Sequence, residues 1–199
     1  MADYPVITIG RQYAAGGRTV AKLVSEALDI PYYDKDFVKK TADESGYTVE
    51  DINREGEEMT KHNSFWNTVL NNSTSYTSSF DGIYKAERNT TIELAQSPCI
   101  LVGRSANAIL KENNIKAFNV FLYADLDFRI KRAEELNDYG DTDVEKYVRR
   151  RDALRETYCK VYSELDMNDL RNYDLCINTG AVGYEKAAEL IIASIKEMA

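Results

Sequence analysis

The residues best suited to chemistry lie in a loop near the start of the chain, Gly10-Arg11-Gln12-Tyr13-Ala14-Ala15-Gly16-Gly17-Arg18-Thr19. A β-branched run enters this loop, and an amphipathic helical pattern follows it. A helix start attracts anions through its free N–H groups and the helix dipole, and glycines let the backbone wrap closely around an anion. This order of strand, glycine loop and helix predicts a cradle for phosphate. The alternative is a purely structural strand–turn–helix.

The loop departs from the usual phosphate-loop pattern, G-x-x-x-x-G-K-[ST]. Five residues separate Gly10 from Gly16, and no lysine follows. If Arg18 takes the lysine position, Gln12 stands where the first glycine belongs. If Gly16 is the second glycine, Arg11 stands there instead. The residues alone leave both registers open.

A second group of side chains suited to phosphate chemistry lies in a basic stretch at residues 145–162. Arg151 and Arg155 are four residues apart and share a helix face, and Asp152 can pair with Arg155. The planar fork of arginine binds two phosphate oxygens at once, and phosphoryl transfer mainly needs positioning and charge neutralisation. The alternative is a solvated helix face with internal salt bridges. The stretch holds six basic residues: Lys146, Arg149, Arg150, Arg151, Arg155 and Lys160.

Alternating strands and helices must position these groups. Apolar runs predict strands at residues 6–9, 98–104, 118–123 and 173–178, with a short extended piece at 31–34. Helical periodicity predicts helices at residues 19–28, 87–96, 107–111, 127–136, 145–165 and 184–198. Strands separated by helices indicate βαβ units, an α/β fold and a parallel sheet.

Ligands of such sheets bind beyond the carboxyl ends of the strands. Polar, charged and glycine residues gather at those ends: Gly10, Arg11, Asp34, Gly103, Arg104, Asp125, Asn178 and Thr179. Asp34 can also cap a following helix, and Asp125 and Asp127 could cap a helix or orient Mg²⁺ through water. The Asn-, Ser- and Thr-rich residues 67–82 predict a mobile or exposed insert.

Length and composition restrict the class of protein. A chain of 199 residues that is 44% hydrophobic predicts one globular domain. The net charge of −8 argues against a nucleic-acid binder. No apolar run approaches the roughly 18 residues of a membrane span, and the first residues do not have the character of a signal peptide, so we expect a cytoplasmic protein without a membrane partner. The three cysteines fit no CxxC spacing and are expected to be buried core thiols: Cys99, Cys159 and Cys176.

Taken together, the ordered motifs resemble the cytidylate kinase-like family of the P-loop nucleoside monophosphate kinases. The resemblance covers most of the chain except about residues 45–85. It implies a three-layer αβα fold of P-loop kinase type with a five-stranded parallel sheet. It further implies an inserted helical monophosphate-binding region at about 36–90 and an arginine-rich lid at about 138–165. The motifs that carry it are residues 7–13 with 16–18, 32–35, 101–107, 121–124 with Arg129 and Arg132, 152–155 with Tyr158, and 173–179.

The resemblance also implies an activity: transfer of the γ-phosphoryl group of ATP to CMP or dCMP, with Mg²⁺ and with no metal ligand assigned to the protein. We expect a monomer or homodimer with a small-molecule nucleotide substrate. The residues implied for the donor nucleotide are Gly10, Arg11, Gly16, Gly17, Arg18, Thr19, Asn178 and Thr179. Those implied for the acceptor are Asp34, Arg104 and Ser105. Those implied for catalysis are Arg18, Arg151, Asp152 and Arg155.

The sequence departs from the family pattern at two points. Gly17-Arg18 replaces the loop lysine, and Ser105 stands where cytidylate kinases have an aspartate that helps to read the pyrimidine. Two alternatives therefore stay open: a non-catalytic nucleotide sensor, and a kinase for a different small-molecule acceptor. Other residues are given ordinary roles, with His62 at the surface and Phe65 and Trp66 packing the insert. Four tyrosines are expected to line the cleft and core: Tyr32, Tyr33, Tyr158 and Tyr162.

Overall fold

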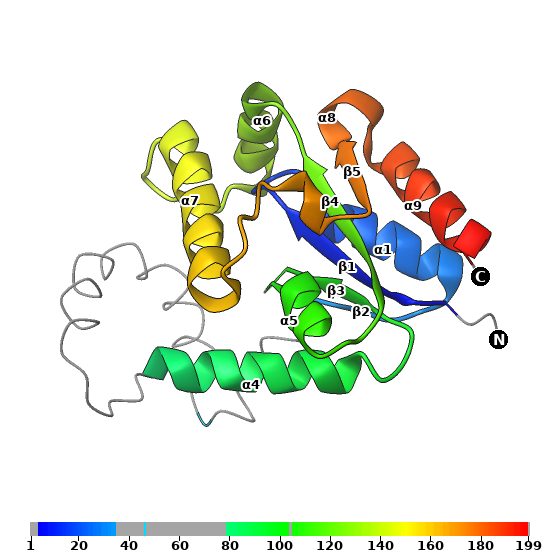
Figure 1. Ribbon diagram of the computed structural model, residues 1–199. Helices are drawn as coiled ribbons and strands as arrows, with labels where there is room; N and C mark the ends of the chain where they lie inside the picture. Colours follow the sequence, from blue (N-terminus) through cyan, green and yellow to red (C-terminus); the bar gives the residue numbers. More distant parts are fainter. Residues whose placement is uncertain (1–3, 35–45, 47–78, 104, 199) are drawn as a thin grey trace.

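The computed structural model describes residues 4–34, 46, 79–103 and 105–198 (Figure 1). Its centre is one five-stranded sheet in the order β2-β3-β1-β4-β5, and every neighbouring pair of strands is parallel. The central strand is β1, so the loop that follows β1 opens at the middle of the carboxyl edge. The strands are β1 (Val6–Arg11), β2 (Tyr32–Tyr33), β3 (Ile100–Val102), β4 (Ala117–Tyr123) and β5 (Leu175–Asn178).

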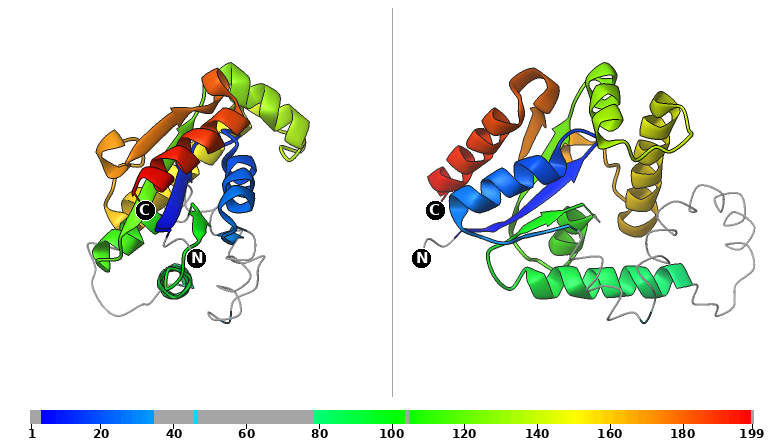
Figure 2. Two further views of the ribbon diagram at one scale, coloured as in Figure 1. Left: turned by 90° about the vertical axis from the view of Figure 1, so that its right-hand side faces the viewer. Right: turned by 180° about the vertical axis from the view of Figure 1, so that it is seen from behind.

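Helices cover both faces of the sheet, which gives the predicted three-layer α/β architecture. Helices α1 and α9 lie side by side on one face (Figure 2), while α5 and α4 pack on the other. Helix α7 packs against α6 and stands beside the carboxyl edge (Figure 1). The helices are α1 (Gly17–Leu28), α4 (Ser79–Leu94), α5 (Ala106–Glu112), α6 (Leu126–Leu136), α7 (Val144–Ser163), the 3₁₀ turn η1 (Leu170–Asn172), α8 (Thr179–Val182) and α9 (Tyr184–Met198).

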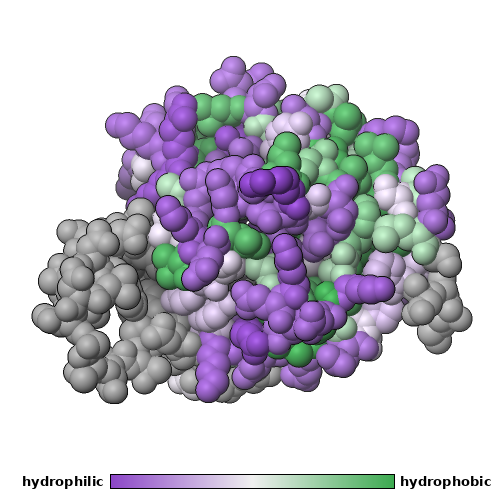
Figure 3. Space-filling model, viewed as in Figure 1, coloured by the Kyte–Doolittle hydropathy of each residue, from purple (hydrophilic) through white to green (hydrophobic). Residues whose placement is uncertain are grey.

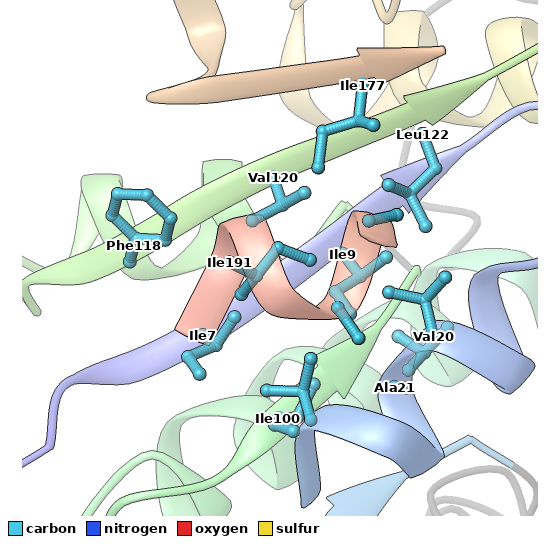
Figure 4. Close-up of a cluster of buried hydrophobic side chains, with 14 of the residues drawn as sticks. Ile7, Ile9, Val20, Ala21, Ile100, Phe118, Val120, Leu122, Ile177 and Ile191 are labelled. Atoms are coloured by element: carbon cyan, nitrogen blue, oxygen red, sulfur yellow. The ribbon is translucent and has the colours of Figure 1, made fainter. Parts of the chain in front are cut away.

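The main core lies between the sheet and the α1–α9 layer. Ile7 and Ile9 of β1 are fully buried there and meet Val20 of α1 and Ile191 of α9 (Figure 4). The opposite side of β1 belongs to a second cluster, in which Val6 packs with residues of β3 and α5. Because both faces are covered, the strands β1, β3 and β4 consist largely of apolar residues. This core holds the loop after β1 in a fixed place.

Most predicted elements are confirmed, with shifted ends. The helix expected from Glu87 begins at Ser79, so the last four residues of the predicted insert at 67–82 are helical. The sequence did not predict η1 or α8. Of the three cysteines, Cys99 and Cys159 are buried as predicted, whereas Cys176 is only partly buried.

Some predictions fall outside the part of the chain that the structure describes. They concern His62, Phe65, Trp66, most of the inserted region at 36–90, and a helix capped by Asp34. Within the described residues, no helix has the length and apolar character that crossing a bilayer requires. Figure 3 shows hydrophilic residues over much of the face seen in Figure 1, in keeping with a chain that is 29% charged.

Candidate active site

The loop between β1 and α1 has the backbone of a tight cradle. Gly16 is the N-cap of α1 and adopts φ +85°, a left-handed conformation that favours glycine. A Cβ atom on Gly16 would lie 2.2 Å from Cε1 of Tyr184, so the neighbouring ring also excludes a side chain there. Helix α1 begins at Gly17. The structure therefore favours the register in which Gly16 is the second glycine of the phosphate-loop pattern and Gly17 stands in the lysine position.

The side chain of Arg11 fills the space above the start of this helix. A Cβ on Gly17 would lie 3.0 Å from Cγ and 3.2 Å from Cδ of Arg11. A Cβ on Gly103, just after β3, would lie 1.8 Å from Nη1 of the same arginine. The Arg11 side chain thus crosses two glycines and is 19% exposed. Its guanidinium lies at the carboxyl edge between β1 and β3.

Asp34, just after β2, faces two of the predicted arginines. One of its oxygens accepts a hydrogen bond from Nε of Arg18, and the other lies 4.0 Å from Nη2 of Arg11. The Arg18 side chain is 65% exposed, whereas that of Asp34 is 12% exposed. Two cationic groups and one carboxylate therefore stand together at this end of the sheet. Thr19 follows in the first turn of α1 and is partly buried.

Asp152 of α7 fastens that helix to the loop. Its Oδ1 accepts a hydrogen bond from the backbone N–H of Tyr13 at 2.6 Å, and its Oδ2 pairs with Nη1 of Arg129. Arg129 is buried in α6 and also donates through Nε to the carbonyl of Ala124 at 2.9 Å. The carboxylate of Asp152 thus ties α7, α6 and the loop together, and it engages one loop amide that a phosphate could otherwise use.

Two arginines of α7 pack on the ring of Tyr13. The guanidinium carbon of Arg151 lies 5.7 Å from the ring centroid. The guanidinium carbon of Arg155 lies 5.4 Å from the same centroid. Both contacts fall within the range of cation–π attraction. Because Nη1 of Arg155 also lies 3.4 Å from the backbone oxygen of Arg11, the predicted arginines of α7 meet the predicted loop, although the two segments are far apart in the sequence.

Burial shifts the pKa values of two groups in this cluster. Burial lowers the pKa of the Arg155 guanidinium well below its usual range, the positive charge of Arg11 lowers it further, and Asp152 opposes the shift. Burial also raises the pKa of the Tyr13 phenol, and its hydrogen bond to Asp138 acts in the same direction. An unfavourable environment for a cation becomes favourable when a negatively charged group binds beside it.

Two other residues predicted to bind the donor nucleotide make hydrogen bonds to the protein backbone. The Thr179 hydroxyl is buried and donates to the carbonyl of Ala15 at 2.9 Å, which ties the start of α8, directly after β5, to the loop. Asn178 caps α8, since its Oδ1 accepts from the N–H groups of Gly180 and Ala181 at 3.1 and 3.2 Å. Both residues lie at the carboxyl edge as predicted, and these side-chain contacts support the loop and α8.

Of the three residues predicted to bind the acceptor, the structure describes Asp34 and Ser105. Ser105 is the N-cap of α5 with φ +51° and makes no side-chain capping bond, and Arg104 lies outside the described residues. Asp125 stands at the N-cap of α6, also without a side-chain capping bond, and Asp127 lies in the first turn.

The four tyrosines differ in exposure. Tyr32 is exposed, Tyr33 packs on a core cluster, and Tyr158 and Tyr162 are half-buried with ring centroids 5.0 Å apart.

Sequence reasoning assigned no site role to Tyr13 or Arg129, although both organise the loop. For Tyr13 the loop sequence offers no signal. The sequence does carry a signal for Arg129, because Arg129 and Ala133 are four residues apart and form the buried face of α6. A basic residue on the apolar stripe of a helix usually has a buried partner.

Several known proteins are similar to this chain in sequence. A model of the cytidylate kinase-like family matches residues 6–181. A cytidylate kinase from Thermoplasma volcanium is 28% identical over 194 residues, which cover 96% of this chain and 92% of that protein. A second cytidylate kinase, from Methanococcus vannielii, is 27% identical over 96% of this chain and 99% of its own length.

Solved structures share the fold. An uncharacterized protein from Eubacterium ventriosum superposes with a TM-score of 0.68 at 25% identity, covering 96% of this chain and 98% of that one. The shikimate kinase from Acinetobacter baumannii, solved with shikimate, gives a TM-score of 0.56 at 16% identity over 98% of this chain and 94% of its own. The second likeness concerns the fold alone.

Proposed function

Because the chain belongs to the cytidylate kinase-like family, we propose that it transfers the γ-phosphoryl group of ATP to a nucleoside monophosphate, with CMP or dCMP as the favoured acceptor. The family match identifies the chain as a kinase, and the cytidylate kinases among its relatives support activity on a nucleotide. The fold is that of the P-loop kinases, and the loop after β1 has their order of strand, glycine loop and helix.

One observation carries the proposal: guanidinium groups from three segments meet at the glycine loop. Arg11 comes from β1, Arg18 from α1 and Arg155 from α7, and the N-terminus of α1 opens between them. Helix starts and arginine forks both bind phosphate oxygens. Burial, and after it the charge of Arg11, lowers the pKa of Arg155, and Asp152 offsets this only in part, so a bound anion would favour the charged form of Arg155. A polyphosphate supplies the missing negative charge.

The residues fit the two proposed cofactors differently. The cradle, with its bare glycines and arginines, fits the phosphates of ATP. Magnesium prefers carboxylate, phosphate and water oxygens. Among the described side chains no group of three potential ligands is arranged for a metal ion. We therefore expect Mg²⁺ to be held mainly by nucleotide oxygens and water, where it would neutralise phosphate charge.

The proposed roles follow the positions. Gly10, Gly16, Gly17 and Thr19 line the donor cradle, and Asn178 and Thr179 support it from β5. Arg18 serves the donor phosphates and pairs with Asp34, which belongs to the acceptor side together with Ser105. Arg104 is assigned to the acceptor from the sequence alone. Arg151 and Arg155 offset the charge of the transferred group, and Asp152 is a positioning residue for the loop. An acceptor phosphate oxygen bonds to the γ-phosphorus, the bond to the bridging oxygen breaks, and ADP leaves with that electron pair.

A panel of acceptors tests the proposal. The protein is incubated with ATP, Mg²⁺ and each nucleoside monophosphate, and ADP and the new diphosphate are measured by mass spectrometry. We expect turnover with CMP or dCMP above that with AMP, GMP and UMP. Arg155→Ala should lower turnover by about 10³-fold, by analogy with arginine fingers. Lys111→Ala, an exposed lysine of α5, is the matched control and should retain the wild-type rate.

The alternatives give different results in the same assay. ATP-induced thermal stabilisation without turnover on any acceptor would favour a nucleotide sensor. Turnover only with a non-nucleotide from a mixed metabolite pool would favour a different acceptor, which the serine at position 105 makes a concrete alternative. If ATP neither stabilises the protein nor is turned over with any acceptor, nucleotide binding itself is refuted.

A further inference from the structure

The start of α1 lacks the cation that the phosphate-loop pattern provides. In that pattern the lysine reaches the β- and γ-phosphates of the donor. The register set by Gly16 places Gly17 at the lysine position, so α1 offers no side chain there. Arg18, the next residue, is 65% exposed and pairs with Asp34. If the loop binds a transferable phosphoryl group, another cation must serve it.

The side chain of Arg11 occupies the volume that a lysine at position 17 would need. Its Cγ, Cδ and Nε lie 3.0, 3.2 and 3.5 Å from the site of a Gly17 Cβ. Its guanidinium continues to Gly103, where Nη1 would lie 1.8 Å and Cζ 2.7 Å from a Cβ. A real Cβ does not come this close, so residue 103 must be glycine while Arg11 keeps this course. The three residues form one unit made of two bare backbone positions and the arginine that covers them.

The surroundings of Arg11 suit an anion-binding role. The carboxylate of Asp34 is 4.0 Å away at Oδ1 and already pairs with Arg18 through Oδ2. A second guanidinium, that of Arg155, lies 3.4 Å from the Arg11 backbone oxygen, and the charge of Arg11 is among the causes that lower its pKa. Two arginines are thus held close together at the helix start that the proposed function assigns to the donor phosphates.

We propose that Arg11 performs the task of the missing P-loop lysine, reaching the β- and γ-phosphates of ATP from the end of β1 instead of from α1. The inference rests on the proposed function. As the acceptor oxygen bonds to the γ-phosphorus and the bond to the β–γ bridging oxygen breaks, the electron pair stays on that oxygen of ADP. The Arg11 guanidinium offsets the negative charge that grows there and on the γ-oxygens.

An exchange experiment tests this assignment. Arg11→Met keeps an unbranched side chain over the two glycines and removes the charge, so it should fold. It should lower kcat with the best acceptor by about 10²-fold or more, as loss of one charge-stabilising donor does, with a smaller rise in the KM for ATP. Gly17→Lys alone should also be impaired, because its side chain collides with Arg11. The pair Arg11→Ala with Gly17→Lys should recover at least tenfold over Arg11→Ala.

The controls separate this inference from the proposed function. Arg171→Met removes an exposed arginine of η1 that pairs with Asp169, and it should keep the wild-type rate. Circular dichroism melting of every variant checks folding. An Arg11→Met rate within threefold of wild type, or a double variant no faster than Arg11→Ala, would overturn the assignment. If the wild-type protein transfers no phosphoryl group at all, the proposed function fails. Loss of ATP-induced stabilisation in Arg11→Met would then still support phosphate contact by Arg11, and its retention would refute it.

Discussion

The contacts of Asp152, which join α7 to the loop after β1 and to α6, can be tested through Asp152→Asn. This change keeps the shape of the side chain and an acceptor for the Tyr13 N–H group, but it removes the negative charge that pairs with Arg129. The two charged side chains are 14% and 9% exposed, so water screens the pair little. Breaking a buried pair costs about 3–5 kcal/mol. Arg129 keeps its hydrogen bond to the Ala124 carbonyl, which favours the lower end of that range, about 3 kcal/mol.

Thermal unfolding measures this loss of stability as a lower Tm. For a domain of this size, 1 kcal/mol corresponds to about 2–4 °C in Tm, so Asp152→Asn should melt about 6–12 °C below wild type. Glu145→Gln is the matched control, because it breaks a pair with Arg149 on the same helix that is 49% and 63% exposed. Such exposed pairs contribute about 0.5 kcal/mol, or less than about 2 °C. If the two variants melt within about 2 °C of each other, the pair with Arg129 does not hold the loop.

A double-mutant cycle separates the pair from its surroundings. Arg129→Leu and Asp152→Leu should each destabilise the protein, because each leaves one partner charged and buried. The double variant should cost less than the sum of the two, with a coupling of about 2 kcal/mol. Additive effects within about 0.5 kcal/mol, measured by urea denaturation, would show that the two side chains act independently.

Further predictions concern the glycine loop and the thiols. Gly16→Ala should cost about 2–4 kcal/mol, because it adds left-handed strain and overlap with an aromatic ring of α9. Gly140 has φ +59° and open space around it. Gly140→Ala should therefore cost only about 1 kcal/mol, and equal urea midpoints for the two variants would contradict this. Ala14 has φ +60°. Ala14→Gly should relieve that strain and stabilise the protein by up to about 1 kcal/mol, and a loss of stability would refute it. Burial raises the pKa of Cys99 to about 12 and also raises that of Cys176, but Cys176 is only partly buried. Iodoacetamide should therefore label Cys176 before Cys99 in the native protein under mildly alkaline conditions, as followed by mass spectrometry. Equal labelling rates would contradict it.

The sheet could be predicted from the sequence because strands that are buried on both faces appear as apolar runs. The strands β1, β3 and β4 are largely apolar runs, and polar or glycine residues follow them where the chain reaches the carboxyl edge. The elements that were not predicted have no comparable hydrophobic pattern. Helix α8 has four residues and η1 has three, too few to show a helical period. The start of α4 at Ser79 lies among Ser and Phe residues without the apolar spacing that marked Glu87 onward.

The sequence indicated candidate site residues, but it did not indicate the contacts between them. Glycines and arginines indicated phosphate chemistry, since few other ligands need both. The contacts that organise them join distant segments, such as the Tyr13 N–H to Asp152 and the Thr179 hydroxyl to the Ala15 carbonyl. Spacing along the chain carries no information about such pairs. The register of the loop also stayed open, because it depends on the residue at which α1 begins.

Gly17 and Gly103 show why a departure from a motif is best judged together with its spatial neighbours. Taken alone, glycine in the lysine position removes a charge from the loop. In space, the same glycine makes room for Arg11, and Gly103 makes room for the end of that arginine. Restoring lysine at position 17 alone would place two long cationic side chains in one volume, so a single step back to the usual pattern is unfavourable. The course of the Arg11 side chain thus depends on glycine at both positions, as the proposed role of Arg11 requires.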